Sequence, residues 1–136
     1  AFSSIMRALT LALAGIASVS LAVAGVGIMN VMLVSVTERR AEIGLLKAIG
    51  ARDRQVLAAF LTEAALLSTV GGLVGLGTGL GAIYVFVRFY PSFPAVPPTW
   101  AVAAALGMSV LVGVVFGVWP ARRATRLDPV AALVKR

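Results

Sequence analysis

The segment TERRAEIGLLKAIGARDR, residues 37–54, decides how the rest of the chain is arranged. Charged residues gather in it, whereas residues 8–37 before it and 64–87 after it contain no Asp, Glu, Lys or Arg. Uncharged apolar stretches of this length are typical of membrane-spanning helices. The segment is therefore predicted to be a short charged connection between two spans, in contact with water or with a partner.

The connection has the pattern of an amphipathic helix, which we predict over residues 38–50. One helical face is apolar and carries Ala41, Leu45, Ala48 and Ile49, with Arg40 and Lys47 opposite. A second apolar stripe consists of Ile43, Leu46 and Gly50, and Gly50 also suits a helix stop. Two interpretations stay open: an interfacial helix between two spans, or a helix that packs one stripe on the bilayer or its own spans and docks the other into a cytosolic protein.

Composition supports a membrane protein. Of 136 residues, 60% are hydrophobic and the mean hydropathy is +1.02, which excludes an ordinary soluble domain. The net charge of +7 does not indicate nucleic acid binding, because the basic residues flank apolar runs and do not interleave with aromatic ones. The chain has no Cys, no His and no pair of acidic residues within a span, so we expect no catalytic, cofactor-binding or metal-ligating residue and no enzyme activity in this chain.

We predict an all-α, polytopic fold with three transmembrane helices, at about residues 9–36, 55–87 and 100–119, and a tail at 120–136. The first span would be about 40 Å long, against a hydrocarbon core of roughly 30 Å. Either it tilts strongly, or residues 1–13 project beyond the bilayer and pack against something else. Asn30 is the strongly polar residue in this span, and its amide is expected to bond a neighbouring helix.

The second span begins near Gln55, and Asp53 is placed to cap or complement its N-terminus. Glu63 lies about two turns into this span, so it is either solvated near the interface or buried and paired with an Arg of the connection. Glycines repeat every four residues at Gly71, Gly75 and Gly79, which predicts a face for close helix packing.

The third span has a Trp at each end, as expected at membrane interfaces, and Thr99 is placed to cap it. Before it, residues 88–99 contain four prolines and form a short outer loop. After it, Asp128 and Pro129 predict the N-cap and first turn of a short terminal helix.

The basic residues set the orientation. Ten of the twelve lie in the connection or the tail, namely Arg39, Arg40, Lys47, Arg52, Arg54, Arg122, Arg123, Arg126, Lys135 and Arg136. The connection and the tail are therefore predicted to be cytoplasmic, with the N-terminal end outside. A chain normally needs an earlier span or signal to place that end outside, so we expect something upstream.

Three motifs resemble, in order and spacing, the FtsX-like permease domain of the MacB family of ABC transporters. They are MNVMLVSVTERRAEIGLLKAIGAR from Met29, FLTEAALLSTVGGLVG from Phe60 and PARRATRLDPVAAL from Pro120. The resemblance covers about residues 17–133. This chain departs from some members at Arg52 and Asp53, where a Ser or Thr often starts the following helix.

The resemblance implies that the chain is spans two to four of a four-span permease, with the first span and a large extracytoplasmic domain missing from it. The connection would match the coupling helix that contacts a cytosolic ATPase, through Glu38, Arg39, Glu42, Ile43, Leu46, Lys47 and Gly50. ATP and Mg would bind to that ATPase, since the chain lacks the GxxxxGK[ST] motif. The permease would work as a homodimer or heterodimer in the cell membrane.

The resulting hypothesis is a permease that transmits ATP-driven conformational change to an extracytoplasmic domain, for export or mechanotransmission. An alternative is an ion-coupled carrier or pore that uses Glu63, Asn30 and Arg88.

Overall fold

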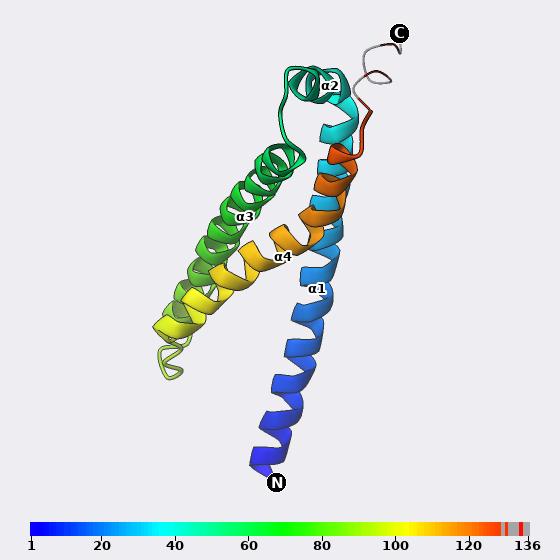
Figure 1. The fold of residues 1–136 in the computed structure, drawn as a ribbon. Coiled ribbons are helices and arrows are strands. Elements are labelled where there is room, and N and C mark those ends of the chain that lie inside the picture. Colours follow the sequence, from blue (N-terminus) through cyan, green and yellow to red (C-terminus); the bar gives the residue numbers. More distant parts are fainter. Residues whose placement is uncertain (129, 131–133, 135–136) are drawn as a thin grey trace.

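The computed structural model describes residues 1–128, 130 and 134, and within them the chain forms helices and no strand. The helices are α1 (Phe2–Glu38), α2 (Arg40–Ala48), α3 (Asp53–Phe89) and α4 (Thr99–Thr125). Figure 1 shows three long helices, with the short α2 across one end. The all-α prediction is confirmed.

α1, α3 and α4 are each long and apolar enough to cross a membrane. Each contains one of the predicted spans and extends beyond it. α4 continues six residues past Trp119 to Thr125, with Pro120 inside the helix. The predicted cap at Thr99 is wrong, because Pro98 occupies the N-cap position and Thr99 is already the first helical residue. Of the predicted terminal helix, Pro129 and most other residues lie outside the described part, but Asp128 Oδ1 accepts a hydrogen bond from the Val130 N–H at 3.0 Å.

α3 and α4 pack closely along a seam of small residues. On α3 the seam consists of Ala64, Ser68 and Gly72, and on α4 of Ser109, Gly113, Gly117 and Ala121. The Ser109 hydroxyl donates to the Ser68 carbonyl at 2.7 Å, which links a side chain of α4 to the backbone of α3. Small residues every four positions let helix backbones approach closely, as is common between membrane helices.

α1 meets α4 only along its C-terminal half. The Phe116 ring of α4 lies against the bare backbone of Gly25, where an added Cβ would come within 2.5 Å of the ring. By contrast, residues 2–20 of α1 are all exposed. Figure 1 shows this half extending away from α3 and α4. The 37-residue helix is about 55 Å long, well beyond the roughly 30 Å that a span requires.

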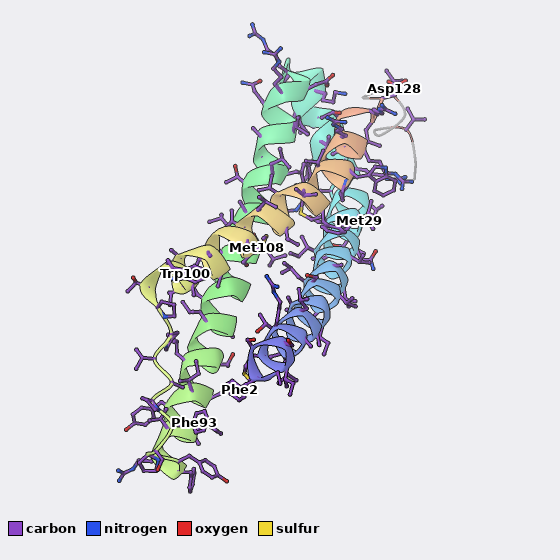
Figure 2. The ribbon with its side chains drawn as sticks, turned by 90° about the horizontal axis from the view of Figure 1, so that it is seen from below. Phe2, Met29, Phe93, Trp100, Met108 and Asp128 are labelled. Atoms are coloured by element: carbon purple, nitrogen blue, oxygen red, sulfur yellow. The ribbon has the colours of Figure 1, made fainter. Side chains whose placement is uncertain are left out.

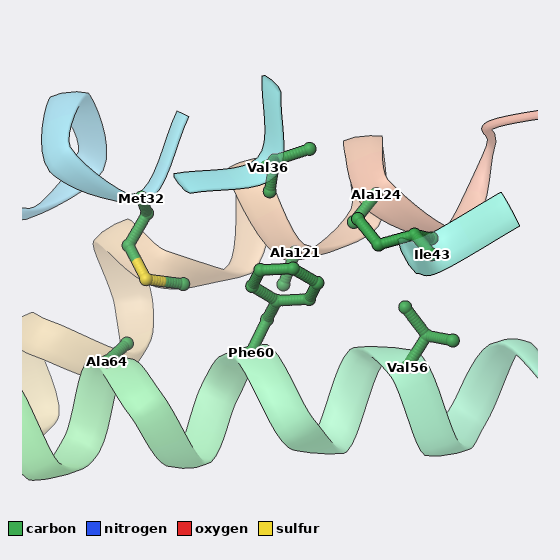
Figure 3. Close-up of a cluster of buried hydrophobic side chains, with 8 residues drawn as sticks. All are labelled: Met32, Val36, Ile43, Val56, Phe60, Ala64, Ala121 and Ala124. Atoms are coloured by element: carbon green, nitrogen blue, oxygen red, sulfur yellow. The ribbon is translucent and has the colours of Figure 1, made fainter. Parts of the chain in front are cut away.

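The apolar core lies at the α2 end of the molecule (Figure 3). It joins all four helices through eight buried side chains: Met32, Val36, Ile43, Val56, Phe60, Ala64, Ala121 and Ala124. In Figure 2, Phe93 of the proline-rich loop and Asp128 after α4 lie far apart, at opposite ends of the molecule. The connection and the described start of the tail, up to Asp128, therefore share one end, as the predicted topology requires.

Candidate functional site

The site is built on the junction where α1 turns into α2. Arg39 serves both helices, because its N–H donates to the Ser35 carbonyl at 3.0 Å and its carbonyl accepts from the Ile43 N–H at 3.0 Å. A single residue thus closes α1 and opens α2 without an intervening loop. The predicted helix of residues 38–50 is shorter in the structure, at Arg40–Ala48, because Glu38 ends α1.

Gly50 ends α2 as the sequence predicts. Its φ of +104° lies in the region that favours glycine. The Gly50 N–H donates to the Lys47 carbonyl at 3.1 Å, and the Ala51 N–H donates to the Leu46 carbonyl at 2.9 Å. These two bonds form a Schellman motif, which satisfies carbonyls that the helix end would otherwise leave free.

Four residues separate α2 from α3, and the N-terminus of α3 is capped in a way that the sequence did not predict. The Gln55 side-chain oxygen accepts the backbone N–H of Arg52 at 2.8 Å, half of a capping box. Asp53 is the first helical residue and complements the helix dipole from there. The start of α3 is therefore capped although Arg52 and Asp53, and not Ser or Thr, stand there.

The inner face of α2 packs into the chain itself. Ile43 is 3% exposed and lies among Val56 of α3 and Ala124 of α4 (Figure 3). Burying an aliphatic side chain of this size contributes about 1.5–3 kcal/mol to folding. The prediction that Ile43 contacts a partner protein is not supported, because the core of this chain already encloses its side chain.

Lys47 lies on the same inner face and joins three helices. Its ammonium group donates to the carbonyls of Thr125 at 2.5 Å and Leu127 at 3.1 Å, at the C-terminal end of α4. It also pairs with the Asp53 carboxylate of α3 at 3.1 Å. Only 14% of the Lys47 side chain is exposed, against 67% for Asp53. Lys47 was predicted to contact a partner, but its charged end is turned inward.

A cleft of about 440 Å³ opens between α2 and the first turns of α3. Its lining includes Glu42 and Leu46 of α2, and also Arg39 and Glu63. The Arg39 guanidinium pairs with the Glu63 carboxylate at 3.5 Å, so Glu63 has the predicted Arg partner from the connection but is not buried as that alternative required. Both side chains are about half exposed, so the pair contributes at most about 1 kcal/mol to stability.

The outer face of α2 is apolar and exposed. Leu45 is 55% exposed, Leu46 48% and Ile49 76%, and Ala41 and Ala48 are exposed beside them. Glu38 and Glu42 are also exposed. The two predicted stripes are thus redistributed: the first stripe faces outward, Leu46 lies at the edge of this face and also lines the cleft, and Ile43 faces the spans.

The residues predicted to pack helices together do not do so within this chain. An added Cβ at Gly71, Gly75 or Gly79 would meet no atom within 4 Å, so these glycines face open space. Asn30 is exposed on α1, and no hydrogen bond found among the described residues involves its amide. The prediction that these glycines and Asn30 pack the spans of one chain together is wrong. Their packing against a second chain stays a prediction.

The glycines that do pack were missed. An added Cβ would lie 2.6 Å from Ser109 Oγ at Gly72, 2.7 Å from Ala64 Cβ at Gly117, and 3.2 Å from the Ala64 carbonyl oxygen at Gly113. The signal was present in the sequence as small residues every four positions on both helices, but it included Ser and Ala as well as Gly.

The residues of the carrier alternative are not brought together. Glu63 and Arg88 lie about 37 Å apart along α3, at about 1.5 Å per residue. Glu63 is engaged by Arg39, and Asn30 faces outward from α1.

Comparison with known proteins gives a consistent result. The family described as FtsX-like permease C-terminal matches residues 14–129. The chain is 46% identical over 98% of its length to a macrolide export ATP-binding/permease protein MacB of Bdellovibrio bacteriovorus, of which it covers 20%. It is 46% identical over 95% of its length to a probable export ATP-binding/permease protein MacB of Pseudomonas entomophila, of which it covers 19%.

A probable syringafactin export ATP-binding/permease protein, SyfD, of Pseudomonas syringae pv. tomato is equally similar, at 46% identity over 95% of the chain and 19% of the relative. The chain thus spans about a fifth of the length of the curated relatives that it matches.

Proposed function

Because the chain belongs to the FtsX-like permease C-terminal family, we propose that α2 is the coupling element of an ABC transporter permease, which passes ATP-driven motion from a cytosolic ATPase to the spans. In this proposal ATP and Mg bind to the ATPase, and a pair of permeases in the cell membrane carries the motion to an extracytoplasmic domain. The names of the relatives, which join ATP binding to a permease, support an ATPase partner.

The observation that carries the proposal is that α2 has one face attached to the spans and one face exposed. Its inner face is fixed to α3 and α4 through Ile43 and Lys47, while its outer face leaves Leu45, Leu46 and Ile49 exposed. A push on the outer face would therefore move the α4 C-terminus and the α3 N-terminus together with α2. An apolar helix face of this kind suits a groove on a partner protein.

The test uses a full-length permease together with its ATPase, and the variant Leu46→Asp. A charge placed in a desolvated contact should weaken ATPase binding by about 2 kcal/mol or more, roughly thirtyfold, and remove stimulation of ATP hydrolysis. The measurements are ATPase stimulation and, where the ATPase is a separate subunit, co-purification, with the amount of permease in the membrane measured in parallel.

Two control variants separate coupling from folding. Ile43→Asp should reduce the amount of folded permease, because it places a charge in the core. Leu45→Asp should harm membrane insertion if α2 merely lies on the bilayer, in which case Leu46→Asp would be mild. Normal expression of Leu46→Asp with normal ATPase stimulation would refute the coupling role and leave α2 as an interfacial helix.

A further inference from the structure

The last turns of α4 carry a basic and aromatic face that the coupling role does not use. Trp119, Arg122, Arg123 and Arg126 follow at i, i+3, i+4 and i+7, the spacing of one helix face. Together they line a hollow of about 350 Å³. The Arg123 guanidinium lies over the Trp119 ring, 5.7 Å from its centroid.

This face is held outward by the packing of the opposite one. Pro120, Ala121 and Ala124 are buried, the two alanines with no exposed surface, whereas Trp119 is 54% exposed and the three arginines are exposed. Rotating α4 to hide the arginines would expose the seam with α3. The basic face is therefore fixed by the fold and is not a chance arrangement of mobile side chains.

The positive charge of this face is not neutralised within the described part of the chain. The ion pairs found there are Arg39–Glu63 and Lys47–Asp53, and neither involves these arginines. The nearest carboxylate in sequence, Asp128, accepts the backbone N–H of Val130. The C-terminal end of a helix carries about half a negative charge and Asp128 one more, so three guanidinium groups still leave an excess of roughly one and a half positive charges.

The face also lies where a span meets the membrane surface. Residues 89–121 contain no charged side chain, and Trp119 stands near the end of that stretch. Tryptophan prefers the headgroup level of a bilayer, and arginine binds phosphate oxygens in a two-pronged geometry. We propose that this face binds the phosphodiester headgroup of an anionic glycerophospholipid in the leaflet on the α2 side, with Trp119 at the level of the glycerol backbone.

The proposal is tested on a delipidated full-length permease, titrated with phosphatidylglycerol or phosphatidylcholine and analysed by native mass spectrometry. We expect phosphatidylglycerol to be preferred, and the triple variant Arg122→Gln, Arg123→Gln, Arg126→Gln to lose roughly tenfold or more of that affinity. The matched control is Arg40→Gln, Arg52→Gln, Arg54→Gln, which removes the same charge from exposed positions at the same end of the molecule and should retain the affinity.

A further variant shows whether a loss of lipid binding is due to misfolding. Replacing the same three arginines by Lys keeps the charge but not the planar geometry, and should retain part of the preference. Equal phosphatidylglycerol binding by the wild type and the Gln variant would overturn the proposal, as would an equal loss in the control. Release of the ATPase from the Gln variant with unchanged lipid binding would also overturn it, and would assign the face to a protein contact.

Discussion

At the scale of single residues, Lys47 shows how one side chain can connect distant parts of the chain. Its flexible stem brings an ammonium group to the free carbonyls at the end of α4, where a positive charge is favoured, and to a carboxylate in the first turn of α3. These partners lie 78 residues later and 6 residues later in the sequence. The contacts of Lys47 therefore attach α2 to both α3 and α4.

Replacing Lys47 by Met should separate binding of the ATPase from transmission of its motion. Met fills similar space but cannot bond the α4 carbonyls, and the Asp53 it leaves behind is largely exposed and so can be solvated. We expect the variant to fold and to bind the ATPase, but to export substrate several-fold more slowly per ATP hydrolysed. The measurement is the ratio of transport to hydrolysis in proteoliposomes, and an unchanged ratio would show that Lys47 only stabilises the fold.

Two glycines give a matched pair for testing the seam. Gly113→Leu places a large side chain against Ser68 and the Ala64 carbonyl, and overpacking of this kind costs about 1–3 kcal/mol. Gly75→Leu fills open space in the single chain and should leave the thermal stability of the chain unchanged.

Both glycine variants are compared in detergent by size-exclusion chromatography after heating. Equal stability of the two would contradict the seam described above. If Gly75→Leu instead reduces association between permease chains while Gly113→Leu does not, then the glycines at 71, 75 and 79 pack against a second chain.

At the scale of elements, the end of α2 depends on local backbone geometry. Gly50→Ala keeps the chain connected but places a Cβ at a φ of +104°, which costs about 1 kcal/mol. We expect the Gly50 and Ala51 amides to lose protection, because their bonds to the Lys47 and Leu46 carbonyls form the Schellman motif. The measurement is hydrogen exchange by mass spectrometry over residues 45–55.

The control for this variant is Gly27→Ala, at a helical glycine of α1 with nothing within 4 Å of the added Cβ. This control variant should not speed amide hydrogen exchange in any part of the chain. Unchanged exchange at the end of α2 in Gly50→Ala would mean that tertiary packing, and not the glycine conformation, stops the helix.

At the scale of the whole molecule, α2 and the C-terminal end of α4 share one end, and the proline-rich loop lies at the other (Figures 1 and 2). The basic residues predict that the α2 end faces the cytosol. Cysteines at the exposed positions Ala48 and Ser92, in a permease with no other Cys, should react with a membrane-impermeant reagent from the cytosolic side and from the outside, respectively. The reverse pattern would overturn the orientation and with it the coupling role of α2.

The sequence determined the elements, because membrane helices and their ends depend on local chemistry. Uncharged runs of about twenty residues or more require internally bonded backbones, which fixed three long helices, and the charged connection with Gly50 fixed α2 and its stop. The Arg39–Glu63 pair was also within reach as part of one of two alternatives, since Arg39 lies in the connection and Glu63 near the start of the span that follows it.

Tertiary structure alone decided which face of each helix meets which neighbour. Ile43 and Leu46 are similarly apolar, so hydropathy could not distinguish Ile43, which is buried in the core, from Leu46, which lines the cleft and stays half exposed. For the same reason the sequence predicted a packing face at the glycines 71, 75 and 79. The seam between α3 and α4 instead contains Gly72, Gly113 and Gly117. Rotation of a helix about its axis is set by the fit of small residues against a specific partner, and the pattern on one helix does not contain that fit.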